Sequence, residues 1–290
     1  METQNKFLEH WKQLEASEPR PTRMRNILEI EFDELRRKVL KQEPVFVRGL
    51  VNSLWSGDVY LVKRAFDRAW VENVKKSTAE YFQKTPPSFY KMKEGCPDFH
   101  RIIDAEMTKL YAVGAVKHAC YFFPWNEDPL DLFEPIGERW KIYKFLSGFS
   151  LDEYIHNTPK DGVVDRIQIC VYPSGAGGLE THSDPYLNQR VFISGYLSQR
   201  GEDFNDGGFY AINQKDEKVD LESRIEVGDM GFGYATILHG VNPIDPAMES
   251  DWKNTGKGRW FLGLYSNDSD EKEKRHTGYM VNLSQAAYRV

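Results

Sequence analysis

The spacing of apolar positions predicts that the first part of the chain is rich in helix. Between residues 6 and 41, Leu28, Leu35 and Val39 lie seven and four positions apart, which places them on one face of a helix. A short buried strand is predicted over 43–50, and further helical stretches are predicted over 59–83, 99–118 and 130–150.

The pattern changes at Asp165. From there on, short runs rich in β-branched and aromatic residues alternate with turns that contain Gly or Asn-Asp, a pattern typical of strands. The runs cover residues 166–172, 190–197, 208–212, 231–239 and 259–265. Short strands at this spacing indicate a sandwich or an open barrel.

Neither a low-complexity linker nor an internal repeat separates these two parts. We therefore predict one domain over 1–290, with a mainly β fold whose core is flanked by helices. In this division, residues 1–160 supply the helical and substrate-side elements, 161–268 form the β core, and 269–290 form a C-terminal tail.

Composition narrows the possible partners. The chain has 290 residues and a formal net charge of -6, so no basic excess is available to neutralise phosphates and we expect no nucleic-acid partner. Three cysteines without a CxxC pair favour a reducing compartment. The sequence shows neither a secretory signal nor a transmembrane run, so we expect a cytoplasmic protein. The basic cluster at 36–38 is expected to be a solvated helix face, while peripheral contact with a membrane stays open.

Three candidate metal ligands stand in the β-rich part. His182 and Asp184 are two residues apart, so on extended backbone their side chains leave the same face of a strand. His239 follows 57 residues after His182, which is enough chain for a separate strand to deliver it. Two imidazoles and one carboxylate on one side of a metal form the facial triad of iron(II) oxygenases, which leaves positions open for substrates. Each histidine alone is as readily an ordinary hydrogen-bonded side chain, so the prediction depends on the combination.

Seven motifs follow one another in a recognisable order. They are Tyr172-Pro173-Ser174-Gly175, His182-x-Asp184, the strand that opens at Arg190 and ends Tyr196-Leu197-Ser198, Gly207-Gly208-Phe209, Val227-Gly228-Asp229, His239-Gly240-Val241-Asn242-Pro243 and Gly258-Arg259. This order resembles the iron(II)/2-oxoglutarate-dependent dioxygenases, in the branch that includes prolyl hydroxylase-like and phytanoyl-type enzymes. The resemblance implies a double-stranded β-helix core, also called a jelly roll or cupin-like fold.

The resemblance also implies a co-substrate site. In that family, 2-oxoglutarate chelates the iron, and its distal carboxylate meets a basic residue at the start of the last core strand. Arg259 matches that position, and a guanidinium can grip a carboxylate through two parallel hydrogen bonds. Its separation of 20 residues from His239 is longer than usual, which we attribute to a polar surface loop over 247–254.

Three further residues are candidates for the co-substrate site. Lys257 is the alternative cation, although its position indicates the loop before the last strand. Tyr172 and Arg190 are second candidates for co-substrate binding. A core tyrosine and a surface arginine at a strand end explain these two residues equally well.

The implied activity is that of a 2-oxoglutarate-dependent oxygenase that uses iron(II), 2-oxoglutarate and O2. Hydroxylation of an unactivated C–H bond is the expected outcome, while desaturation, cyclisation and epimerisation stay open. We expect a small-molecule or glycolipid substrate. A faint resemblance to Kdo hydroxylases acting on lipopolysaccharide suggests a sugar acid, to be recognised by the following basic side chains: Lys91, Lys93, His100 and Arg101.

Two other classes of protein remain as alternatives. A cupin-like metal-dependent isomerase or epimerase would share the fold and the metal ligands, but it has no need of a buried arginine opposite the metal, so Arg259 favours the oxygenase. A non-catalytic jelly-roll binding protein would have lost its metal, and the complete set of His182, Asp184 and His239 favours an enzyme.

Overall fold

Two four-stranded layers form the core of the computed structural model, which describes residues 5–111, 113–250, 252, 257–276 and 279–280. The major layer has the strand order β10 (Met230–Tyr234), β7 (Val191–Tyr196), β12 (Gly258–Asp268) and β5 (Val163–Pro173). The minor layer has the order β6 (Gly178–Ser183), β11 (His239–Asn242), β8 (Gly208–Ile212) and β9 (Lys218–Asp220). Neighbours within each layer are antiparallel.

Strands from the first part of the chain extend this core. β2 (Val59–Lys63) pairs with β10, and β1 (Ile27–Glu31) pairs with β2. On the other side, β4 (Ala115–Phe122) pairs with β5 through residues 118–122 and with β6 through Ala115 and Val116, so this one strand joins the two layers. β3 (Phe99–Ile103) pairs with β4, and β13 (Tyr279–Met280) pairs with β6.

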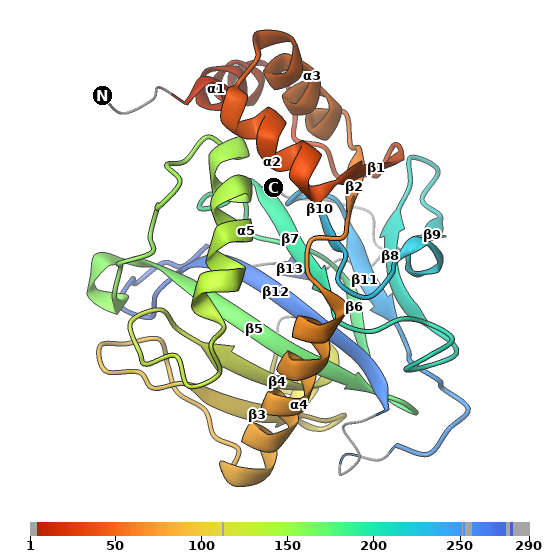
Figure 1. Cartoon of the computed structure of the whole chain (residues 1–290). Helices are drawn as coiled ribbons and strands as arrows, with labels where there is room; N and C mark the ends of the chain where they lie inside the picture. The colour runs from red at the N-terminus through yellow and green to blue at the C-terminus, as the bar shows by residue number, and fades with distance from the viewer. Residues whose placement is uncertain (1–4, 112, 251, 253–256, 277–278, 281–290) are drawn as a thin grey trace.

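Helices cover the outer face of the major layer. α4 (Arg68–Lys84) and α5 (Phe133–Leu146) lie across it in Figure 1, while α1 (Lys6–Ser17), α2 (Phe32–Lys41) and α3 (Pro44–Trp55) gather at one end. Aromatic contacts fix this layer: Phe82 of α4 stacks on His118 of β4 with ring centroids 3.5 Å apart. Tyr143 of α5 meets Phe232 of β10 edge-on at 5.3 Å.

The fold is mainly β, as predicted, and its helices α1 to α5 all precede residue 160. Helix α5 confirms the helical prediction over 130–150. The five predicted strand runs correspond to β5, β7, β8, β10 and β12, although the run over 231–239 breaks at a turn, so that His239 opens the separate strand β11.

Two predictions in the first part of the chain are wrong. Residues 44–50 lie in helix α3, not in a strand, because the buried side chains Val47, Leu50, Val51 and Leu54 share one helix face and Pro44 suits the first helical turn. Residues 99–118 form β3, a 3₁₀ turn (Met107–Leu110) and the start of β4, not a helix. Strand β1 interrupts the helical stretch predicted over 6–41, and strand β2 occupies the start of the stretch predicted over 59–83.

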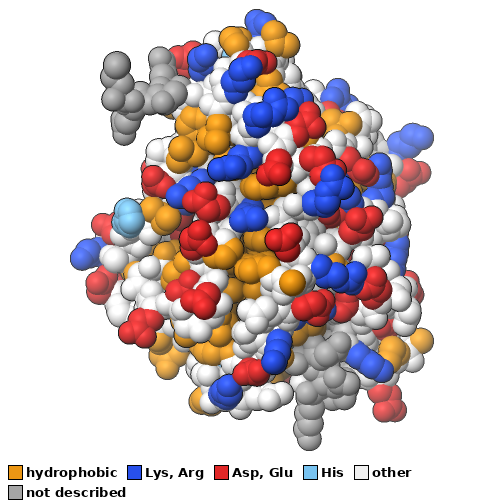
Figure 2. Space-filling view, in the orientation of Figure 1, with side chains coloured by type: hydrophobic (Ala, Val, Ile, Leu, Met, Phe, Trp, Pro, Cys, Tyr) orange, Lys and Arg blue, Asp and Glu red, His pale blue; other side chains and the backbone are white. Residues whose placement is uncertain are grey.

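Acidic and basic side chains are interspersed on the helical face of the molecule (Figure 2). Among the described residues, none of the helices combines the length and apolar character needed to cross a bilayer. Part of the predicted tail, 277–278 and 281–290, and part of the predicted loop, 251 and 253–254, lie outside the described residues.

Candidate metal centre

Two adjacent strands bring the predicted histidines together. His182 lies near the end of β6 and His239 at the start of β11, and the two residues are direct partners in the antiparallel register. Their ring centroids are 4.4 Å apart. A separate strand therefore places His239 beside His182, as the spacing predicted.

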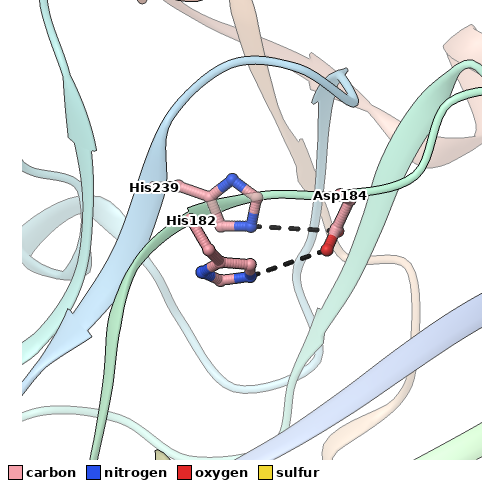
Figure 3. A group of neighbouring side chains, drawn as sticks. All are labelled: His182, Asp184 and His239. Carbon is pink, nitrogen blue, oxygen red and sulfur yellow. Dashed lines mark ion pairs between the residues drawn. The ribbon is translucent and has the colours of Figure 1, made fainter. Parts of the chain in front are cut away.

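Each histidine has its ring orientation fixed by a backbone carbonyl. Nδ1 of His182 is 2.9 Å from the carbonyl oxygen of Glu180, and Nδ1 of His239 is 2.9 Å from that of Ile237. An imidazole that donates from Nδ1 keeps the lone pair of Nε2 for a metal, the usual support of a metal-bound histidine. Both Nε2 atoms point toward Asp184 (Figure 3).

Asp184 completes the group from the residue after Ser183, the last residue of β6. Its backbone N–H donates to the carbonyl of Ala235 at 2.9 Å, which holds the turn in place. Its Oδ1 is 3.5 Å from Nε2 of His182, and its Oδ2 is 3.8 Å from Nε2 of His239. The candidate ligand atoms all lie within 4.8 Å of one another. These separations fit one ion bound by two nitrogens and one oxygen.

The surroundings of the group favour the protonation states that bind a metal. Burial lowers the pKa of His239 to about 4, so its ring is neutral at pH 7. Burial alone would raise the pKa of Asp184, but its contacts with His182 and His239 and the charge of Lys117 outweigh burial, and the pKa falls below its ordinary value. Neutral imidazole and ionised carboxylate are the metal-binding forms.

Arg259 is buried at the start of β12, and it is paired with an acid that the sequence did not point to. Its Nε donates to Oε2 of Glu222 at 2.7 Å, and both side chains are 1% exposed. Oε2 of Glu222 also accepts from the backbone N–H of Phe209 at 2.6 Å. Glu222 stands in a short turn between β9 and β10, and only the folded chain shows that it meets β12.

The terminal nitrogens of Arg259 are available to a ligand. Nη1 and Nη2 are buried and have no hydrogen-bond partner among the described residues. Buried donors without a partner cost about 1–3 kcal/mol each. A ligand carboxylate would satisfy both through two parallel hydrogen bonds, so the residues present fit the distal carboxylate of 2-oxoglutarate.

Backbone geometry places Arg259 opposite Tyr172. The two residues are partners in the antiparallel pairing of β12 with β5, and the Arg259 guanidinium carbon is 5.9 Å from the tyrosine ring centroid. Gly258 begins the strand with φ +137, and a Cβ there would lie 2.4 Å from the carbonyl oxygen of Tyr172. Only glycine allows β12 to start this close to β5.

Arg190 lies elsewhere, contrary to its prediction as a co-substrate residue. Its Nε and Nη2 donate to the two oxygens of Glu15 at 2.8 and 3.1 Å, and its Nη1 donates to the carbonyl of Ser147 at 2.7 Å. The guanidinium therefore ties helix α1 to the end of α5. These contacts leave it no part in the candidate metal centre.

His100 is also unavailable for the sugar-acid role that its sequence neighbourhood suggested. Its Nδ1 is 2.8 Å from Nε2 of His118, and its Nε2 is 2.6 Å from the carbonyl of Thr85. Arg101 lies over the ring of Phe89, 4.3 Å from its centroid. Lys91 and Lys93 are exposed. The structure does not gather these four residues into one basic site.

Comparisons with known proteins were made by sequence and by structure. No protein-family model matches the sequence, and no curated protein matches it. In structure, the chain is similar to a full-length Neurospora crassa protein in complex with alpha-KG and thymine, with a TM-score of 0.50 and 14% identity over 85% of this chain and 87% of that chain. This likeness and the two antiparallel layers confirm the double-stranded β-helix core that the motif order predicted.

Two further structures have a similar course of the chain at lower scores. A prolyl-4-hydroxylase from Pseudomonas putida has a TM-score of 0.46 and 11% identity, over 80% of this chain and 97% of that chain. A putative 2OG-Fe(II) oxygenase family protein from Caulobacter crescentus has a TM-score of 0.44 and 10% identity, over 86% of this chain and 88% of that chain.

Proposed function

We propose that the protein is an iron(II)- and 2-oxoglutarate-dependent oxygenase that hydroxylates a C–H bond of a small polar substrate. The observation that carries the proposal is the pairing of two sites in one core. His182, Asp184 and His239 present two nitrogens and a carboxylate to one point, and Arg259 presents two buried N–H groups without partners among the described residues. A metal isomerase needs only the first of these sites.

The three ligands would hold iron(II) on one side and leave the opposite side for 2-oxoglutarate and O2. Iron(II) with these two co-substrates supplies the oxidising chemistry, with succinate and carbon dioxide as co-products. Phe192 and Phe209 pack on the ring of His239, with centroids 4.7 and 5.9 Å from its own. These rings hold the imidazole in place and exclude water from that side of the centre.

In the proposed 2-oxoglutarate site, Glu222 orients Arg259, and Arg259 binds the co-substrate. Glu222 accepts from Nε of Arg259 and fixes the plane of the guanidinium. Both Nη groups then remain for the distal carboxylate of 2-oxoglutarate, in the bidentate geometry that a lysine cannot offer. The rings of Tyr172 and Phe261, 5.9 and 5.8 Å from the guanidinium carbon, keep water away from this pair.

The cysteines and the distribution of charge support a cellular compartment and a class of substrate. Cys96, Cys120 and Cys170 are free and buried, which supports a reducing compartment such as the cytoplasm. The interspersed charges on the helical face and the acidic balance of the sequence support a small-molecule substrate in place of a nucleic acid.

The test is a visible spectrum recorded without oxygen. Iron(II) is added to the metal-free protein, followed by 2-oxoglutarate, and we expect a weak charge-transfer band that requires both additions. The band should be lost in Asp184→Ala and in His239→Ala. Arg259→Gln should need at least about tenfold more 2-oxoglutarate for half of the band, because it loses charge-assisted hydrogen bonds of about 1.5–3 kcal/mol.

A surface variant is the matched control. Arg224→Gln removes an exposed guanidinium that pairs with Glu29 on the surface, and it should leave the titration unchanged. Iron binding by the wild-type protein without any band after 2-oxoglutarate would overturn the proposed function and favour a metal-dependent isomerase.

A further inference from the structure

The backbone is fixed on both sides of Asp184. On one side, the N–H of Asp184 donates to the carbonyl of Ala235 at 2.9 Å. On the other side, Pro185 follows, and a proline restricts the residue before it to extended conformations. The next residue, Tyr186, donates its backbone N–H to Nε2 of His276 at 3.2 Å. The direction in which the Asp184 side chain leaves the backbone therefore depends on how Tyr186 is held.

His276 holds Tyr186 as a hydrogen-bond acceptor. Because a backbone N–H can only donate, Nε2 of His276 must carry its lone pair, and the neutral ring has its proton on Nδ1. Burial lowers the pKa of His276, which favours this neutral form. The ring also meets that of Tyr186 edge-on, with 4.7 Å between the centroids. A hydrogen bond and ring packing thus fix the same residue.

Asp268 holds His276 and the loop after Asp184 together. It is the last residue of β12 and is 4% exposed. Its Oδ2 accepts from the backbone N–H of His276 at 2.8 Å, and its Oδ1 accepts from the side-chain amide of Asn188 at 3.1 Å. Burial would raise the pKa of Asp268, but hydrogen bonds from Lys272, His276 and Asn188 keep it below its ordinary value. The carboxylate is therefore ionised at neutral pH.

A further contact anchors the loop over 184–190 to β12. The backbone N–H of Ser266 donates to Oε1 of the buried Gln189 at 2.7 Å. The end of β12 and the segment after it therefore hold this loop at Tyr186, Asn188 and Gln189. Among these three residues, Tyr186 lies nearest to Asp184 in the chain, so its bond to His276 has the most direct effect on the carboxylate.

Ligands that are in place before an ion arrives bind it more tightly, because binding does not then have to order them. Without an acceptor for the N–H of Tyr186, the turn through Pro185 would lose its fixed end. The incoming ion would then have to order this turn itself, and its affinity would fall.

We propose that His276 is a positioning residue of the metal centre: by accepting the N–H of Tyr186, it sets the direction of the Asp184 carboxylate. The inference rests on the proposed function, because it takes His182, Asp184 and His239 as the metal ligands. His276 acts through Tyr186 and does not belong to the ligand group of the described residues. The C-terminal part of the chain thereby contributes to the metal centre.

The experiment titrates the metal-free full chain with Co(II) without oxygen, and the visible d–d bands of the ion report binding and coordination. Two variants separate the hydrogen bond from the ring. His276→Phe keeps a ring against Tyr186 but has no acceptor, and it should weaken Co(II) binding at least about tenfold and alter the d–d bands. His276→Gln lacks the ring but offers an amide oxygen as the acceptor, and it should bind Co(II) like the wild-type protein.

A variant in the same segment is the control. Glu271 accepts from the N–H of Glu94 at 3.4 Å and has no printed part in holding the loop after Asp184. Glu271→Gln should therefore leave the affinity and the bands unchanged. Circular dichroism of each metal-free variant shows that it is folded. If His276→Phe does not fold, His276→Ala takes its place, with the same expected loss relative to His276→Gln.

The outcomes separate the two proposals. A wild-type protein that binds Co(II) but gives no charge-transfer band with iron(II) and 2-oxoglutarate overturns the proposed function alone. Wild-type affinity and bands in His276→Phe overturn only the positioning role. An equal loss in His276→Phe and His276→Gln would show that the imidazole itself is needed, not the hydrogen bond to Tyr186, and would also overturn that role. Absence of Co(II) binding by the wild-type protein overturns both.

Discussion

Glu222 and Arg259 form an ion pair in which both side chains are 1% exposed, with 2.7 Å between Oε2 and Nε. The pair joins a turn before β10 to the first residues of the last core strand. Because Oε1 of Glu222 and both Nη atoms of Arg259 have no partner among the described residues, the pair is incomplete on one side. We therefore expect stability and co-substrate binding to depend on the same two residues.

Removal of either charge should destabilise the protein strongly. Glu222→Ala leaves a buried guanidinium and Arg259→Ala leaves a buried carboxylate, so each should lower the free energy of unfolding by about 3–5 kcal/mol. The double variant should lose less than the sum, because no unpaired charge remains. Urea denaturation measures all three. The exposed pair of Arg224 and Glu29 is the control, with losses below about 1 kcal/mol, and strictly additive losses at Glu222 and Arg259 would contradict the prediction.

Two glycine-to-alanine substitutions should shift stability in opposite directions. A Cβ at Gly231 would lie 2.3 Å from the hydroxyl oxygen of buried Tyr196, so Gly231→Ala should cost about 1–3 kcal/mol of unfolding free energy. Gly49 lies inside helix α3 with nothing within 4 Å of an added Cβ, so Gly49→Ala should gain about 0.5–1 kcal/mol. Thermal denaturation compares the two, and a shift of the same sign in both would be inconsistent with these contacts.

Tyr196 also gives the first of these variants a second readout. Its ring centroid is 5.7 Å from the guanidinium carbon of Arg259. Displacement of the ring by Gly231→Ala should therefore weaken 2-oxoglutarate binding in the charge-transfer titration. Gly49→Ala should leave that titration unchanged.

The stability of the protein should depend on pH through Asp98. Burial raises the pKa of this carboxyl to about 6, against hydrogen bonds from Asn126 and from the N–H of Phe123. The folded state therefore holds a proton that the unfolded state releases near pH 4, so the contribution of Asp98 is greatest below pH 4 and is lost as pH rises to 6. Asp98→Asn removes this dependence while retaining an acceptor.

Urea denaturation between pH 4 and pH 7 measures that difference. The free energy of unfolding of Asp98→Asn should rise by about 2 kcal/mol relative to the wild-type protein over this range. Most of the change should fall below pH 6. A constant difference across the whole range would show that Asp98 is ionised in the folded state throughout.

One cooperative unfolding transition is expected for the whole chain, as the single-domain prediction requires. The main apolar cluster contains Phe7 and Trp11 of α1 together with Trp260 and Leu264 of β12. Because helices and β core share these contacts, neither should unfold alone. Far-ultraviolet and tryptophan signals recorded during urea denaturation should coincide, and two separated midpoints would indicate two units.

Local patterns predicted the β core well, and they also predicted that the candidate metal ligands lie together. The strands over 166–172 and 208–212 combine β-branched or aromatic residues with flanking turns. These properties are local to each segment, so the sequence alone predicts the strands. His182 and Asp184 are close in sequence, so their common direction follows from the backbone alone. The order of the motifs then identified His239 and Arg259 as further candidates.

The errors and omissions concern residues whose environment depends on distant segments. Residues 43–50 contain Val, Phe and Val in succession, which favours a strand locally, but the buried positions that follow in α3 have helical spacing. Glu222 is a charged residue like many others in the sequence. Its pairing with Arg259 arises only when the turn before β10 lies beside β12.

The position of β12 in the sheet also has a consequence for synthesis of the protein. This strand lies between β5 and β7, yet it is made after both of them. Until residue 268 has left the ribosome, the nascent chain therefore carries two open strand edges, each ready to pair with another chain. Closure of the major layer is a late step that joins segments far apart in sequence, and chaperones that shield strand edges should act on this protein until that step is complete.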